Sequence, residues 1–169
     1  LGNLYMRVIT GGGLVVDSTK LKTISGATQA NPVVVTSTSH GLSNGDEVFV
    51  AQVVGMTELN GRQFKIAGVT THTFNLQGMD SVNINGSAYT AYGSAGVAAL
   101  VYEIVTPYTA AQLYDLQYVQ SADVMTLTHP SHPPHELIRT GNDSWTLSQI
   151  GVLAHLLTYR LLQRLTLLL

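Results

Sequence analysis

Hydrophobic and polar positions alternate with a period of two in several short runs, which is the pattern of half-buried β-strands. In residues 63–67, Phe64 and Ile66 alternate with polar neighbours, and residues 73–76 repeat this pattern. Between residues 23 and 97 such runs alternate with turn signals at a spacing of about ten residues. This spacing predicts a small β-sandwich or β-barrel.

The Asn60-Gly61 pair is the strongest turn signal of this stretch. Both residue types tolerate a positive φ, which tight β-hairpin turns require. We therefore expect a hairpin turn at this pair, between a strand over 47–50 and the strand over 63–67.

The segments on either side have a different pattern. Thr109 is a candidate N-cap, because its hydroxyl can accept a hydrogen bond from a free backbone N–H at the start of a helix. The sequence predicts a helix over 110–118 after it. Strands are expected over 4–9, 14–16, 32–36, 102–105, 124–128, 136–139 and 145–148.

The order of these elements indicates an insertion. Without residues 21–100, residues 13–16 would lie beside 102–105, and the two segments could pair as a hairpin. We therefore expect a mainly β chain in which 21–100 form a small β-barrel or sandwich module. This module is inserted into a β-hairpin of a second, α+β segment, 1–20 plus 101–150, which has one short helix.

Residues 151–169 differ in composition from the rest, because nine leucines lie between Leu153 and Leu169. Burial of a leucine side chain contributes about 1.5–3 kcal/mol, so the sequence predicts a C-terminal helix that packs on an apolar surface. Arg160 and Arg164 argue against a membrane span. An aberrant or truncated end is the alternative interpretation. The chain begins at Leu1 and is interpreted as a piece of a longer protein without a signal peptide.

Charge and composition exclude several classes of function. Eight basic and ten acidic residues give a net charge of −2, and the basic residues are scattered, which argues against nucleic-acid binding. The absence of cysteine excludes a disulfide scaffold, a thiolate zinc site and a cysteine nucleophile. We expect no enzyme, no catalytic residues and no cofactor.

The run from His129 to Glu136 is the best candidate for a metal site, because His129, His132 and His135 recur every third residue. In a polyproline II segment these side chains would share one face. Successive rings would then lie about 9 Å apart, which is too far for one ion. The sequence therefore predicts a proline-stiffened surface loop and no metal site.

One group of motifs resembles a small β module found in bacteriophage virion proteins. The module is named for its similarity to the first catalytic-cysteine half-domain (FCCH) of ubiquitin-activating enzymes. The name describes a fold, and ubiquitin chemistry is not implied because this chain lacks cysteine. The matching segments are Thr23–Ala27, Asn31–Thr36, His40–Asp46, Gly55–Arg62 and Phe74–Leu76.

The flanks resemble phage tail proteins. The matching segments are Met6–Ile9, Tyr102–Ile104, Thr106–Tyr108, Gln120–Val124, His129–Pro130 and Ser144–Trp145. The resemblance implies a structural component of a phage or prophage tail, a homo-oligomer that contacts other virion proteins. Its location would be the virion tail, and the host cytoplasm during assembly.

A receptor- or carbohydrate-binding module exposed on the virion is the alternative function. Tyr89 and Tyr92 are the candidate residues for it, because their rings could stack on the sugars of a host surface glycan.

Overall fold

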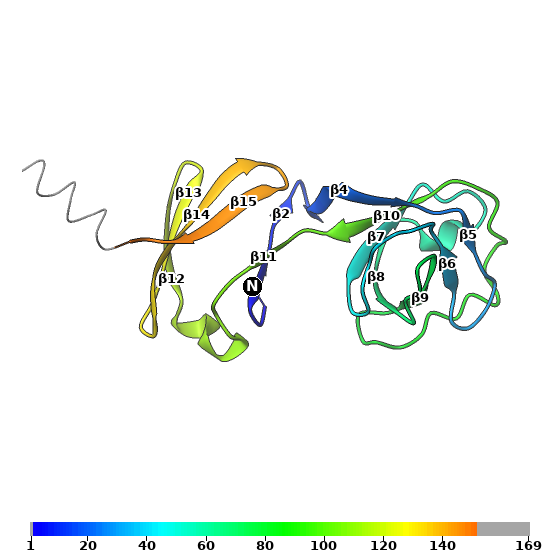
Figure 1. The fold of residues 1–169 in the computed structure, drawn as a ribbon, viewed down its shortest axis with the longest axis horizontal. Helices are drawn as coiled ribbons and strands as arrows, with labels where there is room; N and C mark the ends of the chain where they lie inside the picture. Colours follow the sequence, from blue (N-terminus) through cyan, green and yellow to red (C-terminus); the bar gives the residue numbers. More distant parts are fainter. Residues whose placement is uncertain (1, 152–169) are drawn as a thin grey trace, which may run out of the picture. The chain divides into compact units, whose positions relative to one another are not determined.

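The computed structural model describes residues 2–151, and these residues are mainly β (Figure 1). They form fifteen strands and two 3₁₀ helices, η1 (Thr57–Leu59) and η2 (Ala110–Asp115). The predicted mainly-β class is thus confirmed. The helix predicted over residues 151–169 lies, apart from Gly151, outside the described residues.

The chain forms two compact units. Val8–Tyr102 is one, called here the inner unit, and residues 2–7 together with 103–151 belong to the other, the outer unit. The expected module, 21–100, falls within the inner unit.

A seven-stranded antiparallel sheet makes up most of the inner unit. Its strands, in spatial order, are β4 (Val16–Thr23), β10 (Val97–Val101), β7 (Glu47–Ala51), β8 (Arg62–Ala67), β9 (Thr73–Gln77), β6 (Val34–Thr36) and β5 (Gly26–Ala27). A short hairpin, β2 (Ile9–Thr10) with β3 (Gly13–Leu14), precedes it. In β8 and β9 every second side chain is buried, because Phe64, Ile66, Phe74 and Leu76 all point into one core. The predicted period-two alternation is confirmed there.

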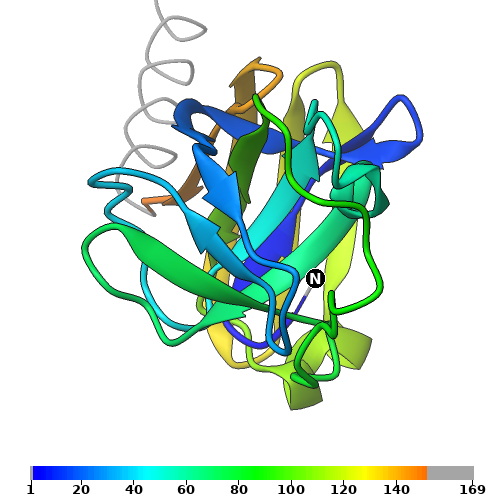
Figure 2. The ribbon, with the colours of Figure 1, turned by 90° about the vertical axis from the view of Figure 1, so that its right-hand side faces the viewer.

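The sheet curls around this core but does not close into a barrel (Figure 2). Its two edge strands, β4 and β5, are consecutive in the chain and separated only by Ile24 and Ser25. The Ile24 N–H donates to Gly96 O at 2.9 Å, and the Ser25 N–H donates to Thr36 O at 2.9 Å. Between β4 and β5 the backbone therefore changes, within two residues, from pairing alongside β10 to pairing with β6. Among residues 2–151, the outer edge of β4 has no partner strand.

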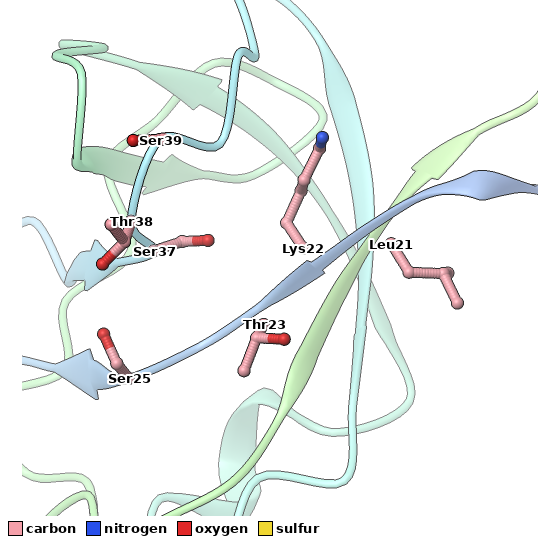
Figure 3. A pocket seen from close by; sticks show the side chains of 7 residues that line it. All are labelled: Leu21, Lys22, Thr23, Ser25, Ser37, Thr38 and Ser39. Carbon is pink, nitrogen blue, oxygen red and sulfur yellow. The ribbon is translucent and has the colours of Figure 1, made fainter.

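The space between this edge of β4 and the loop Ser37–Ser39 is called here the seam (Figure 3). The loop follows β6 directly. His72 holds it, because its carbonyl accepts the Ser37 N–H at 2.8 Å and its ring Nδ1 accepts the Ser39 N–H at 3.1 Å.

The predicted hairpin at Asn60-Gly61 is corrected by the structure. β7 and β8 do pair, but residues 52–61 connect them and include η1. Gly61 has a φ of 73°, whereas Asn60 is extended, with φ −67° and ψ 142°. The Asn60 side chain explains this, because it bonds both the N–H and the carbonyl of Val53 at 2.8 Å.

The outer unit contains two sheets. One is the pair of β1 (Tyr5–Arg7) and β11 (Glu103–Val105). The other is a four-stranded meander of β12 (Gln117–Ser121), β13 (Val124–His129), β14 (His132–Gly141) and β15 (Ser144–Gln149). The predicted strands over 136–139 and 145–148 lie in β14 and β15, which pair as expected.

The pairing expected between 13–16 and 102–105 is shifted in the structure. Val16 pairs with Val101, and the Tyr102 N–H donates to Val15 O at 2.9 Å. Glu103–Val105 pair with Tyr5–Arg7 instead. The sequence contains two segments, 4–9 and 13–16, that can each pair with 102–105, and it does not show which pairing is more stable.

The predicted helix over 110–118 is too long. η2 ends at Asp115, and Leu116 is extended with φ −75° and ψ 124°. From Gln117 the backbone pairs with β13, so Tyr118 belongs to a strand. The predicted start is confirmed, because the Gln112 side chain accepts the Thr109 N–H at 3.0 Å in a capping box.

Candidate functional site

Four aromatic side chains of the outer unit form what we call the His–Tyr cluster: Tyr108, His129, His132 and His135. Tyr108 is fully buried, and its ring centroid lies 6.1 Å from His129, 5.3 Å from His132 and 5.8 Å from His135. The centroids of His129 and His132 are 5.2 Å apart. The predicted separation of successive rings by about 9 Å is therefore wrong for this pair.

The reason is a tight turn. Pro130 and Ser131 connect β13 to β14, so His129 pairs directly with His132. The register shifts beyond this pair, and Pro133 and Pro134 follow it in β14. Prolines are tolerated at such irregular positions because they have no N–H to donate to a neighbouring strand. The segment is thus a bent hairpin end and not a polyproline II run.

Each histidine ring of the cluster makes a different hydrogen bond. His129 Nδ1 accepts the Ser131 N–H at 3.0 Å, so the ring proton of neutral His129 is on Nε2. His132 Nε2 lies 3.0 Å from Gln112 Oε1 and donates to it. His135 Nδ1 donates to Pro133 O at 2.7 Å. These assignments follow from their partners, because an N–H can only donate and a carbonyl can only accept.

This arrangement leaves few free lone pairs for a metal ion. Only Nδ1 of His132 and Nε2 of His135 keep a lone pair that the contacts above do not engage. Among residues 2–151, no group of three or more His, Cys, Asp or Glu side chains is placed to hold a metal. Burial raises the pKa of the Tyr108 phenol, which disfavours a phenolate ligand at neutral pH. The expected absence of a metal site remains a prediction.

Tyr89 and Tyr92, the candidate stacking residues, both pack against the inner core and are partly buried. The Tyr92 hydroxyl donates to Ile24 O at 3.1 Å or Ala95 O at 2.9 Å. The Tyr89 hydroxyl accepts from Arg62 Nη1 at 3.1 Å. A packing role explains both rings without a ligand.

The structure adds a surface that the sequence did not predict, the outer edge of β12. All five residues of this strand are exposed, with Tyr118 at 72% and Val119 at 67%. β12 is the first strand of its sheet, and within residues 2–151 it pairs only with β13. The sequence contains one indication of a strand here, because a mixture of polar and hydrophobic residues precedes the Ala122-Asp123 turn. The helix predicted over 110–118 overlaps the start of this segment, so the strand was not predicted.

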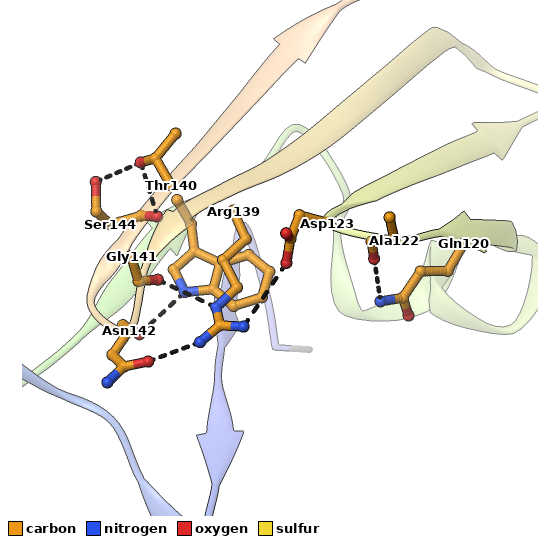
Figure 4. Close-up of polar contacts among 9 residues, drawn as sticks. Gln120, Ala122, Asp123, Arg139, Thr140, Gly141, Asn142 and Ser144 are labelled. Carbon is orange, nitrogen blue, oxygen red and sulfur yellow. Dashed lines mark hydrogen bonds and ion pairs between the residues drawn. The ribbon is translucent and has the colours of Figure 1, made fainter.

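Arg139 holds the β12–β13 turn next to the β14–β15 turn (Figure 4). Its Nη1 lies 3.7 Å from Asp123 Oδ1, and its Nη2 donates to Asn142 Oδ1 at 2.6 Å. The guanidinium carbon also lies 5.8 Å from the centre of the Trp145 ring, whose indole N–H donates to Asn142 O at 3.1 Å. These contacts fix the end of the four-stranded sheet at which β12 turns into β13.

No helix within residues 2–151 is long and apolar enough to cross a membrane. The predicted absence of a membrane-spanning helix is consistent with this part of the chain.

Comparison with known proteins identifies one part of the chain. Residues 20–101 match the family described as the ubiquitin-activating enzyme E1 FCCH domain. The expected FCCH-like module is therefore confirmed, over residues that lie within the inner unit. No curated protein matches the chain.

Proposed function

We propose that this chain, which carries an FCCH-like module over residues 20–101, is a structural component of a phage or prophage tail. It assembles through contacts between subunits and has no catalytic role. The observation that carries the proposal is the exposed, uncharged edge of β12. The resemblance of both flanks to tail proteins supports the setting, with the virion tail as the location and the host cytoplasm as the place of assembly.

The β12 edge has the properties of a strand that pairs with another subunit. Exposed edge strands are normally protected from pairing by lysine, proline or a bulge. Gln117–Ser121 contains no charged residue and no proline, and its register with β13 is regular. Its unpaired backbone groups can therefore accept a further strand by β-augmentation.

The other edge of the same sheet supplies a partner of the same kind. β15 is the last strand of the meander, and Ser144–Gln149 is also uncharged. If β12 of one subunit pairs with β15 of the next, the contact is head-to-tail. Repetition of such a contact closes into a ring when the rotation between subunits allows it. The expected partner is thus a second copy, together with other tail proteins.

Light scattering of the full chain tests this proposal. We expect discrete oligomers, and we expect Val119→Lys to weaken their association by about tenfold or more, because a buried charge would replace a central contact. Val105→Lys is the matched control, since Val105 is an exposed valine of the same unit (83%) that lies on β11.

A wild-type monomer, or oligomers that Val119→Lys leaves unchanged, would contradict the proposal. A glycan array with the same protein examines the alternative, a receptor- or carbohydrate-binding module that uses Tyr89 and Tyr92. Monomers that give a glycan signal lost in Tyr89→Ala would favour that alternative.

A further inference from the structure

The seam between β4 and the loop Ser37–Ser39 contains a cavity of about 350 Å³. This volume is at the lower end of the range for small-molecule sites. The cavity is in the inner unit, and its lining does not include Tyr89 or Tyr92. Seven residues line it: Leu21, Lys22, Thr23, Ser25, Ser37, Thr38 and Ser39.

Hydroxyl groups dominate this lining. Five of the seven side chains are Ser or Thr, and both walls of the seam contribute them (Figure 3). Each hydroxyl can donate one hydrogen bond and accept others, as the hydroxyl groups of a sugar also do. The lining therefore suits a ligand with many hydroxyl groups better than an apolar one.

Ser37 is the most informative of these residues. Its side chain lines the cavity although the residue is only 1% exposed. In Figure 3 its hydroxyl points into the seam, toward the wall formed by β4. No hydrogen bond to this hydroxyl is found within residues 2–151. It is not one of the fully buried side-chain atoms that lack a partner, so the hydroxyl is open to the cavity, and a ligand can take the place of water there.

Lys22 gives the cavity a positive charge. Its ammonium group makes no ion pair with the described residues, and none of the seven lining residues is acidic. By contrast, the Nζ of Lys20, on the same strand, lies 3.5 Å from Asp17 Oδ2 and forms an ion pair with it. An anionic group in the seam would therefore have a nearby cation that is not already neutralised.

The walls of the cavity are held in place before any ligand binds. His72 fixes the loop through the N–H groups of Ser37 and Ser39. β4 is paired with β10 over Leu21–Thr23. A site whose groups are already ordered loses less entropy on binding.

We propose that the seam cavity binds an acidic monosaccharide. The Lys22 ammonium binds its carboxylate, and the hydroxyls of Ser25, Ser37 and Thr38 bond its ring hydroxyls. The site is independent of the assembly proposal, because a ligand titration and an oligomeric state are separate measurements.

Titration of the ¹⁵N-labelled full chain with glucuronate, followed by NMR, tests the proposal. We expect shifts confined to the amides of the seam, weaker binding of glucose, and weaker glucuronate binding as salt is raised. Lys22→Gln should weaken glucuronate binding by about tenfold or more. Lys65→Gln, at a lysine whose Nζ lies 3.3 Å from Ser81 Oγ outside the seam, should leave it unchanged.

Ser37→Ala separates binding from folding. The hydroxyl has no protein partner to lose, so the melting temperature should not fall, whereas glucuronate binding should weaken about fivefold. Absence of seam shifts with glucuronate would overturn the proposal, as would glucose binding as tight as glucuronate binding. Inorganic sulfate that binds as tightly as glucuronate would show an anion site only and would overturn the sugar assignment.

Discussion

At the scale of residues, the His–Tyr cluster shows how one residue type takes different roles within seven positions. His129 accepts a backbone N–H, whereas His132 and His135 donate to Gln112 and Pro133. The differences come from the surroundings of each ring, because the Pro130-Ser131 turn places an N–H at His129, β14 places the Pro133 carbonyl at His135, and η2 places the Gln112 amide at His132. Spacing in the sequence shows that the three histidines are neighbours but does not show which nitrogen atoms are engaged.

This geometry predicts that the cluster does not bind zinc or nickel tightly. Only the lone pairs of His132 Nδ1 and His135 Nε2 are available, and a third nitrogen ligand from the cluster would require loss of the Ser131 N–H bond at His129. Calorimetry of the full chain with each metal should show a Kd no tighter than about 1 μM. Stoichiometric zinc binding below that value, lost in His132→Ala and kept in His72→Ala, would contradict this prediction.

At the scale of elements, hydrophobic alternation carries most of the predictable information. β8 and β9 have alternating side chains with one face in a core, so their sequences specify the strand and its inward residues. β12 has no buried residue, and its five positions give no such signal. The helix predicted over 110–118 overlaps the first residues of β12. Thr109 specifies where the helix begins, whereas the pairing of β12 with β13 decides where the helix ends.

The seam and the contacts of Tyr89 and Tyr92 are not predictable from the sequence either, because they depend on residues that are distant in sequence. The seam exists because the backbone at Ile24 and Ser25 changes its hydrogen-bonding partner from the segment next to β10 to β6. This change depends on pairing between segments that are distant in sequence. Lys22 and Ser37 line one cavity only in the folded protein. Tyr89 and Tyr92 were visible as aromatic residues, but the partners of their hydroxyls are equally distant in sequence.

The long connection between β9 and β10 has an anchor that titrates. The Thr90 N–H donates to Glu58 Oε1 at 2.8 Å, and the Thr90 hydroxyl donates to it at 3.1 Å. The backbone N–H of Thr90, followed by that of Glu58 itself, holds the pKa of the Glu58 carboxyl below its ordinary value of 4.5. The ionised carboxylate in η1 is therefore the form that fastens this connection.

We predict an acid-dependent loss of stability from this anchor. A carboxyl whose folded-state pKa is depressed contributes stability above its unfolded pKa, here 4.5, and this contribution is lost as the pH falls through the folded-state pKa. The melting temperature of Glu58→Gln should therefore fall less than that of the wild type below pH 4.5. Parallel losses in the two proteins would contradict the prediction, and an NMR titration of the carboxyl checks its pKa directly.

At the scale of the whole molecule, the chain passes between its two units at only two points, Arg7 to Val8 and Tyr102 to Glu103. The two ends of the inner unit lie close together, because Val15 donates its N–H to Val8 O at 3.0 Å and accepts the Tyr102 N–H at 2.9 Å. Closely spaced ends allow a unit to be inserted into another fold with little distortion. The inner unit therefore has the geometry of an insertion.

This arrangement predicts that residues 8–102 fold alone and melt cooperatively, as followed by circular dichroism. The shorter fragment 21–100 lacks most of β4, including Val16, the partner of Val101, and therefore lacks much of one edge of the seven-stranded sheet. It retains the shared core of β6 to β9, so it should also melt cooperatively, but at a lower temperature. Deletion of 21–100 with a short Gly/Ser bridge should leave the pairing of β1 with β11 intact, because neither strand is removed. A fragment 8–102 without a cooperative transition would show that the module depends on the outer unit, and the insertion would then not be an autonomous fold.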